Sequence, residues 1–195
     1  MSDASVYNII IAGVGGQGVL LLSNLVAHAA IEAGFDVKTN EVHGMAQRGG
    51  SVLAQVRFGS KVYSPLVWEG SVDLLISLEA GEALRYAHYL KKDAAAIVSS
   101  QKLIPVSVSS GKAVYPDDME ERLRKTFPRL FYLDTMATAH ALGNIKTANM
   151  ISLGAASTLL PQLESQWHLV MNQLIPEKYQ EINRQAFEKG KRSIS

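Results

Sequence analysis

The sequence has 195 residues, with 19 Lys and Arg against 18 Asp and Glu, and no cysteine. A formal net charge of +1 shows none of the basic excess typical of proteins that bind nucleic acids or membrane surfaces. The lack of cysteine excludes disulfides, thiolate nucleophiles and iron–sulfur ligation by this chain. The length suffices for one hydrophobic core and no linker-like stretch divides it, so we expect a single domain over residues 1–195.

The start of the sequence has no basic region before the first strand and no small-residue cleavage pattern, so it does not resemble a secretory signal. No apolar run reaches the length of a membrane-spanning helix. We therefore expect a cytoplasmic protein.

An apolar run that stops at a cluster of glycines opens the chain. Residues 6–12 are too apolar to have a solvated face, which is typical of a central strand in a parallel sheet covered by helices on both sides. Residues 19–33 continue as a mainly apolar helix, and Gly34 suits the left-handed position after its end. The glycines therefore form a strand-to-helix turn.

Gly13, Gly15 and Gly18 match the G-x-G-x-x-G pattern of dinucleotide-binding domains, in the strand–turn–helix context that the pattern requires. Glycines let a ligand approach the main chain, and the N–H groups and dipole at a helix start attract anions. The alternative is that these glycines only permit a tight turn and close packing. We predict a phosphate-bearing ligand, bound by Gly13, Gly15, Gly16, Gln17 and Gly18.

Residues 35–42 predict a second strand, which would close a strand–helix–strand unit with a parallel crossover. Glu41 stands near the place where a nicotinamide-binding domain has an acid for the ribose hydroxyls. Such a domain would normally continue with a helix and a parallel strand. Here two strand-like runs follow instead, residues 51–58 and 61–64, and the Gly-Ser pair between them predicts an antiparallel hairpin.

The polar, glycine-rich loop before that hairpin is a second candidate for ligand binding. Arg48 can hold a phosphate or carboxylate with two hydrogen bonds, and Gln47, Gly49 and Gly50 add donors. We expect this loop to lie near the first glycine turn, since both would follow parallel strands. The alternative is that Arg48 pairs with a nearby acid and the glycines shape the bend.

The rest of the chain predicts an α/β fold. Strands are expected at residues 72–78, 94–99 and 131–134, with less regular strand-like runs at 106–108 and 113–115. Helices are expected at 80–90, from the acids at 117–120 to before Pro128, at 135–143, and through most of the last third. Glu79 suits either a ligand contact or a helix start. The predicted fold is Rossmann-like: a mostly parallel sheet flanked by helices, with an inserted antiparallel hairpin and a helical C-terminal third.

Chemistry for independent catalysis is lacking in the sequence. The five histidines are scattered without a second ligand at metal spacing, and no nucleophile elbow, phosphate-binding Walker loop or kinase motif occurs. We predict no catalytic residue and no metal site in this chain.

Two motifs together resemble the gamma-type subunit or domain of the 2-oxoacid:ferredoxin oxidoreductases. They are Gly13-Val14-Gly15-Gly16-Gln17-Gly18 and Met45-Ala46-Gln47-Arg48-Gly49-Gly50-Ser51-Val52. Residues 41–50 and 62–66 are most similar to the branch of that family that acts on indolepyruvate, and the resemblance extends along nearly the whole chain. Branches acting on pyruvate, branched-chain oxoacids or 2-oxoglutarate share both motifs.

The resemblance implies a complex that oxidatively decarboxylates an arylpyruvate, transfers the acyl group to coenzyme A and passes two electrons to ferredoxin. Thiamine diphosphate and the iron–sulfur clusters would belong to a larger partner subunit, in agreement with the lack of cysteine here. In single-chain relatives the equivalent domain helps to enclose coenzyme A, which would place that cofactor at the glycine turn and at Arg48 to Gly50.

Two other readings remain from the residues alone. The glycine pattern and Glu41 fit a stand-alone nicotinamide-dependent oxidoreductase. The small residues 154–157 would fit a regulatory or interaction module that docks through an apolar helix face.

Overall fold

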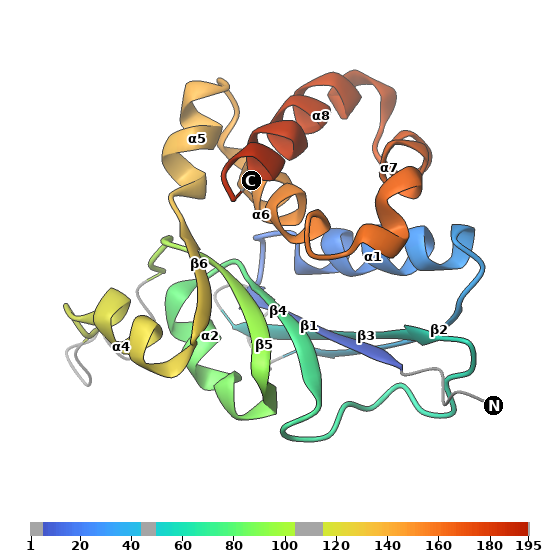
Figure 1. Cartoon of the computed structure of the whole chain (residues 1–195). Helices are drawn as coiled ribbons and strands as arrows, with labels where there is room; N and C mark the ends of the chain where they lie inside the picture. The colour runs from blue at the N-terminus through green and yellow to red at the C-terminus, as the bar shows by residue number, and fades with distance from the viewer. Residues whose placement is uncertain (1–5, 44–49, 104–114, 195) are drawn as a thin grey trace.

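The computed structural model describes residues 6–43, 50–103 and 115–194, apart from the side chain of residue 43. The strands within these ranges form one sheet in the order β2-β3-β1-β4-β5-β6 (Figure 1). Their bounds are β1 Tyr7–Val14, β2 Asp36–His43, β3 Ser51–Gly59, β4 Val72–Ser77, β5 Leu90–Ser99 and β6 Arg129–Leu133. The helices are α1 Val19–Glu32, α2 Ala80–Arg85, α4 Met119–Thr126, α5 Thr135–Ala141, α6 Ala148–Ser157, α7 Trp167–Leu174 and α8 Glu177–Arg192.

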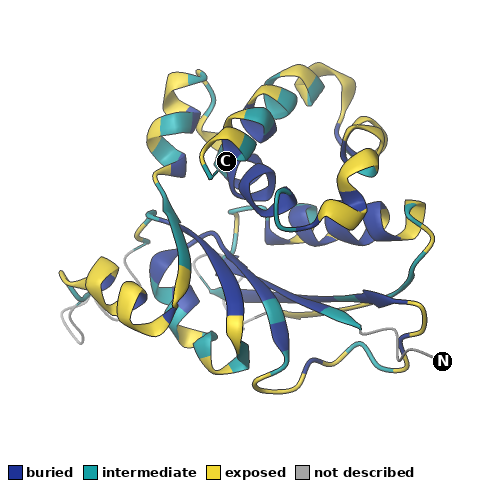
Figure 2. Cartoon of the chain, viewed as in Figure 1, coloured by how far each residue is buried: buried dark blue, intermediate teal, exposed yellow. Residues whose placement is uncertain are grey.

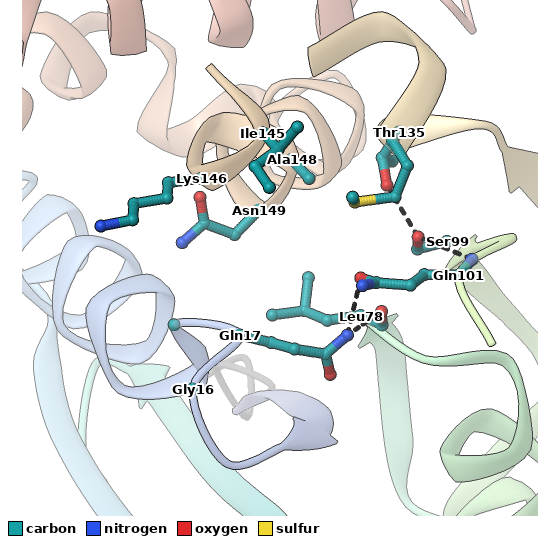
Figure 3. Close-up of a pocket in the computed structure, with 12 residues that line it drawn as sticks. Gly16, Gln17, Leu78, Ser99, Gln101, Thr135, Ile145, Lys146, Ala148 and Asn149 are labelled. Atoms are coloured by element: carbon teal, nitrogen blue, oxygen red, sulfur yellow. Dashed lines mark hydrogen bonds between the residues drawn. The ribbon is translucent and has the colours of Figure 1, made fainter. Parts of the chain in front are cut away.

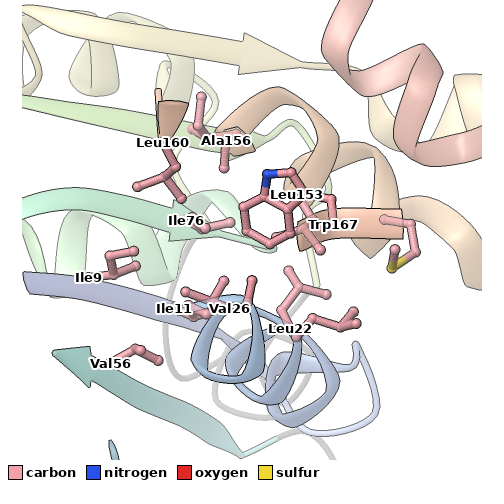
Figure 4. Close-up of a cluster of buried hydrophobic side chains, with 14 of the residues drawn as sticks. Ile9, Ile11, Leu22, Val26, Val56, Ile76, Leu153, Ala156, Leu160 and Trp167 are labelled. Carbon is pink, nitrogen blue, oxygen red and sulfur yellow. The ribbon is translucent and has the colours of Figure 1, made fainter. Parts of the chain in front are cut away.

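Strand β1 lies in the interior of the sheet and is buried on both faces. Ile9 and Ile11 belong to the hydrophobic cluster beneath α1, α6, α7 and α8, around Trp167 (Figure 4). Ile10 belongs to a second cluster, on the face covered by α2 and α4. Because alternate residues of a strand point to opposite faces, an uninterrupted apolar run fits a sheet with helices on both sides, as predicted and as Figures 1 and 2 show.

The pairing of the strands corrects the predicted order. β1 pairs in parallel with β4, β4 with β5 and β5 with β6, but β3 lies between β1 and β2 and is antiparallel to both. The second strand is therefore not the neighbour of the first. An antiparallel strand is thus inserted in the sheet, but its partners are β1 and β2.

The predicted hairpin between residues 51–58 and 61–64 is wrong, because residues 61–64 form no strand. In this segment, backbone groups that a strand would use for pairing form hydrogen bonds with side chains instead. The Val62 N–H donates to the Asp36 carboxylate at 2.9 Å, and Arg57 donates to the carbonyls of Ser64 and Leu66 at 2.7 and 2.8 Å. This segment is thus fixed by buried or half-buried polar groups of β2 and β3.

Other predicted elements are confirmed with changed limits. The expected helix 80–90 ends as α2 at Arg85 and is followed by a 3₁₀ turn, Ala87–Tyr89, before β5 begins at Leu90. Asp118 stands at the start of α4 but makes no capping hydrogen bond through its side chain, and pairs with Arg122 instead. Two further 3₁₀ segments, η2 Ile145–Thr147 and η3 Pro161–Gln166, flank α6. The strand-like runs at 106–108 and 113–114 lie outside the described residues.

Helices α6 and α8 pack with their backbones in contact. A Cβ at Gly154 would lie 1.9 Å from the Phe187 carbonyl oxygen, and one at Gly190 would lie 2.0 Å from that of Ile151. The small residues 154–157 are buried in this contact. They are therefore not a free docking face, which removes the observation that favoured an interaction module.

In the ranges that the structure describes, no helix is both long and apolar enough to cross a membrane. The cytoplasmic location stays a prediction.

Replacing Gly154 with alanine tests the backbone contact. If glycine only lowered helix propensity here, alanine would stabilise the protein by about 1 kcal/mol. Because the methyl group would overlap the Phe187 carbonyl, we expect the free energy of unfolding to fall by about 3 kcal/mol. Denaturant unfolding measures this, and the exposed α8 variant Lys189→Ala, expected to change it by less than about 0.5 kcal/mol, is the control.

The contacts of the Asp36 carboxylate make the stability of the protein depend on pH. The Val62 N–H, followed by Lys38, lowers the pKa of the Asp36 carboxyl to about 2. The unfolded chain therefore takes up this proton first as the pH falls, and the stabilisation present above pH ~4 disappears as the pH approaches 2. Unfolding curves at pH 6, 4, 3 and 2 should show wild type and Asp36→Asn converging at acid pH. A constant difference between them would contradict this role.

Candidate functional site

The glycine turn between β1 and α1 adopts conformations that only glycine takes easily. Gly16 and Gly18 have φ values of +99° and +87°. Gly13 has an ordinary φ, but a Cβ there would lie 2.9 Å from both the Gln17 Oε1 atom and a Val19 methyl group. Of the four predicted glycines of this turn, Gly16 and Gly18 thus set the path of the chain, and Gly13 permits close packing.

Gln17 fastens this turn to the neighbouring strands. Its Oε1 accepts from the Val14 N–H at 2.7 Å, and its Nε2 donates to the Leu78 carbonyl and to the Gln101 Oε1, both at 2.8 Å. Leu78 follows β4 and Gln101 follows β5. The amide therefore joins the ends of three parallel strands, and its donors face protein atoms. The predicted ligand contact of Gln17 stays a prediction.

Gly50, the last residue of the second predicted loop, lies beside the glycine turn. The Gly15 N–H donates to the Gly50 carbonyl at 2.9 Å, which follows from the pairing of Val14 with Ser51 at the ends of β1 and β3. The antiparallel direction of β3 thus brings the start of that strand to the glycine turn. Gln47, Arg48 and Gly49 lie outside the described residues.

A cleft of about 410 Å³ opens above this turn, at the carboxyl ends of the parallel strands (Figure 3). One wall consists of Gly16, Gln17 and Gly18. The opposite wall comes from η2 and the start of α6, whose Lys146 and Asn149 reach toward the start of α1. This is the edge at which open α/β sheets bind ligands.

Ser99, Gln101 and Thr135 form the remaining polar side of the cleft. The hydroxyls of Ser99 and Thr135 are 2.7 Å apart, and the Gln101 N–H donates to the Ser99 hydroxyl at 3.2 Å. Through Gln101 this chain of hydrogen bonds reaches Gln17. This side of the cleft is thus one continuous hydrogen-bond network, from Gln17 before α1 to Thr135 at the start of α5.

The electrostatics of the cleft favour an anion. Lys146 is its one charged lining residue, and no ion pair occupies its ammonium group among the described residues. The first N–H groups of an α-helix have no intrahelical acceptors, and α1 has neither a side-chain cap nor an acid in its first turn to satisfy them. The Gly15 and Gln17 N–H groups already bind carbonyls, which leaves the helix start itself as the donor surface.

Asn149 is a lining residue that the sequence did not predict. The residue is only 7% exposed, yet its Oδ1 has no hydrogen-bond partner among the described residues. Its Nδ2 lies 2.3 Å from the position that a Cβ of Gly18 would take, so glycine is required there by space as well as by φ. Because about 130 residues separate the two positions, no local pattern could have revealed the contact.

Glu79 does not contact the cleft. Its side chain is buried, caps α2 by accepting from the Glu82 N–H at 2.8 Å, and accepts from the Tyr115 hydroxyl at 2.7 Å. Burial, with this hydrogen bond, raises the pKa of Tyr115 above its usual value. Of the two roles expected for Glu79, ligand contact or helix capping, the structure shows capping of α2.

Glu41 is placed away from the position that a nicotinamide-binding domain requires. In the register of the sheet it pairs with Ala54, which pairs with Ile11, so it lies two strands, about 10 Å, from β1. Its carboxylate accepts from the Ser23 hydroxyl at 3.3 Å. The neighbour of β1 on this side is the antiparallel β3, which argues against the nicotinamide reading.

The described lining includes no Asp, Glu or His that could transfer a proton to or from a substrate. The arrangement is suited to binding an anionic group.

Substitution of Gln17 tests whether its amide holds the cleft together. In Gln17→Leu the Val14 N–H and Leu78 carbonyl lose their partner, so we expect the free energy of unfolding to fall by about 2 kcal/mol. Gln173→Leu, at an exposed position of α7, should change it by less than about 0.5 kcal/mol. Equal denaturant midpoints for both variants would show that Gln17 does not brace the turn.

Comparisons with known proteins agree with this geometry. The indolepyruvate oxidoreductase subunit IorB of Thermococcus kodakarensis is 44% identical over 189 residues, covering 94% of each chain. The gamma subunit of a keto/oxoacid ferredoxin oxidoreductase from Geobacter sulfurreducens shares the fold at a TM-score of 0.72 and 23% identity, over 96% of this chain and 98% of that one.

A third similar protein is a 2-oxoglutarate:ferredoxin oxidoreductase from Magnetococcus marinus, solved with 2-oxoglutarate, coenzyme A and succinyl-CoA bound. It matches at a TM-score of 0.74 and 24% identity, and this chain corresponds to 31% of its length. The sequence also matches the family model described as pyruvate ferredoxin/flavodoxin oxidoreductase over residues 8–193. The chain therefore belongs to the pyruvate ferredoxin/flavodoxin oxidoreductase family.

Proposed function

We propose that this chain is the small, gamma-type subunit of a 2-oxoacid:ferredoxin oxidoreductase that acts on indolepyruvate or a similar arylpyruvate. The observation that carries the proposal is the 44% identity to an indolepyruvate oxidoreductase subunit over 94% of both chains. The cleft supports a subunit role, because it offers an anion-binding surface without a proton-transferring side chain among its described residues.

The chemistry belongs, in this proposal, to a larger partner subunit. That subunit holds thiamine diphosphate and the iron–sulfur clusters, takes the 2-oxoacid and passes electrons to ferredoxin. The lack of cysteine in this chain supports the division, because such clusters are held by cysteine thiolates. No role in nucleic-acid or membrane binding is proposed.

Coenzyme A is the ligand that we propose for the cleft. Its diphosphate suits the start of α1 and Lys146, and Gly13, Gly15, Gly16 and Gly18 shape the approach to that helix. The proposed site also includes four residues of the adjoining loop, Gln47, Arg48, Gly49 and Gly50. The bond between Gly15 and Gly50 supports their inclusion. The oxidoreductase of Magnetococcus marinus, whose chain includes a domain of this fold, bound coenzyme A.

A pyruvate, 2-oxoglutarate or branched-chain oxoacid complex is the alternative, since the sequence motifs are shared among these branches. The substrate would then differ, while the role of this chain in the complex would be the same.

The assay that tests the proposal is 2-oxoacid-dependent reduction of ferredoxin or a viologen dye in the presence of coenzyme A. Indolepyruvate, phenylpyruvate, pyruvate and 2-oxoglutarate are compared, with this chain alone and with its co-purified large partner. We expect activity only with the partner and highest on the arylpyruvates. Highest activity on another oxoacid would transfer the assignment to that branch, and inactivity of the complex on all four would overturn the proposal.

A further inference from the structure

We propose that Glu82 is a positioning residue, whose buried carboxylate holds Ser51 and through it fixes Gly50 against the glycine turn. Glu82 belongs to α2, on the face of the sheet opposite α1. Neither Glu82 nor Ser51 is among the described residues that line the cleft, so the effect reaches the cleft through the backbone. The inference rests on the proposed function for one consequence, the affinity of the complex for coenzyme A.

Ser51 is the point at which β3 begins beside the glycine turn. It lies within the motif at residues 45–52 on which the family resemblance rests, and its Cα pairs with that of Val14 at the end of β1. The residue before it, Gly50, accepts the hydrogen bond from the Gly15 N–H at 2.9 Å. The position of Ser51 therefore determines where the Gly50 carbonyl meets the glycine turn.

The hydroxyl of Ser51 is held from the side of α2. It donates to one carboxylate oxygen of Glu82 and lies 3.0 Å from the hydroxyl of Tyr86, the residue after α2. A serine hydroxyl has one proton, which the bond to Glu82 uses, so the Tyr86 hydroxyl is the donor in the second contact. The other carboxylate oxygen of Glu82 accepts from the Arg85 Nε at 3.0 Å. Ser51 is thus fixed by one acceptor and one donor.

A simpler explanation for Glu82 is that an acid in the first turn of a helix interacts favourably with the helix dipole. That interaction does not require burial, yet Glu82 is only 7% exposed. Burying a carboxylate costs free energy unless its oxygens are hydrogen-bonded. One of these oxygens binds a serine 31 positions earlier in the chain, which a role confined to α2 does not explain.

The start of β3 is a place where such an anchor has a large effect. Two glycines, Gly49 and Gly50, precede Ser51 in the sequence, and glycine restricts the backbone less than any other residue. The ends of a ladder also open more easily than its middle. A hydrogen bond to a carboxylate is stronger than one between neutral groups, so Glu82 holds this end closed. It fixes the second glycine-rich stretch as Gln17 fixes the first.

Four variants test the anchor. Ser51→Ala and Glu82→Leu each remove one partner of the bond, and Ser51→Thr keeps the hydroxyl. Ser71→Ala is the matched control, because the Ser71 hydroxyl also donates to a protein oxygen, the Trp68 carbonyl at 2.6 Å, but lies just before β4 begins. Unfolding curves of all variants first establish that each is folded at the assay temperature.

The first measurement is hydrogen exchange of the Gly15 amide in the complex with the co-purified partner. Because this amide is bonded to Gly50, we expect its exchange to accelerate about tenfold in Ser51→Ala and Glu82→Leu. Ser51→Thr and Ser71→Ala should exchange like wild type. Wild-type exchange in both Ser51→Ala and Glu82→Leu would overturn the anchor.

The second measurement is the binding of coenzyme A to the same complexes by calorimetry. Ser51→Ala and Glu82→Leu should each weaken binding about tenfold, and Ser51→Thr should restore it. The double variant should bind like either single variant, because Glu82 acts through Ser51. At saturating coenzyme A, kcat should stay within about twofold of wild type, because the substitutions do not touch the reactive groups. Faster exchange at Gly15 with unchanged binding, or additive effects in the double variant, would overturn the positioning role.

Both measurements are independent of turnover on any oxoacid, so this inference and the proposed function can fail separately. A complex active on arylpyruvates whose Gly15 exchange and coenzyme A binding ignore the variants would retain the proposed function and lose this inference. A complex inactive on every oxoacid that shows the expected pattern in exchange and binding would retain the positioning role of Glu82 and lose the proposed function.

Discussion

The amide of Gln17 is the interaction on which the shape of the cleft depends. It holds the turn after β1 against the residues that follow β4 and β5, and through Gln101 it reaches the hydroxyls of Ser99 and Thr135. A glycine-rich turn is intrinsically flexible, so its conformation must be fixed from outside. Here the Gln17 side chain supplies that restraint through its hydrogen bonds to Leu78 and Gln101 outside the turn, and the start of α1 faces the cleft.

The described lining of the cleft combines the start of α1 with one cation, Lys146, and includes no Asp, Glu or His. Holding an anionic cofactor requires oriented N–H groups and a cation, which α1 and Lys146 provide. Redox chemistry requires metal clusters or organic cofactors with suitable potentials, and a chain without cysteine cannot hold iron–sulfur clusters through thiolates. The lack of cysteine thus supports the proposal that the iron–sulfur clusters are held by another subunit.

The sequence predicted those features that depend on local pattern. The apolar run of β1 indicated burial on both faces, and the glycines indicated the turn before α1, because periodicity and the conformational freedom of glycine act over a few residues. The place of β3 between β1 and β2 was not predicted, since strand order depends on contacts distant in sequence. Asn149 was missed for the same reason: its proximity to Gly18 arises only when α6 packs beside α1. The side-chain hydrogen bonds of Arg57 likewise replaced the strand that residues 61–64 suggested.

The backbone contact between α6 and α8 has a mechanical consequence for the site. With no side chain between them at Gly154 and Gly190, the two helices cannot slide past or rotate against each other without a collision of main-chain atoms. Asn149, which lines the cleft, stands near the start of α6 and so belongs to this tightly packed pair. A movement of α6 that widened or narrowed the cleft would therefore carry α8 with it.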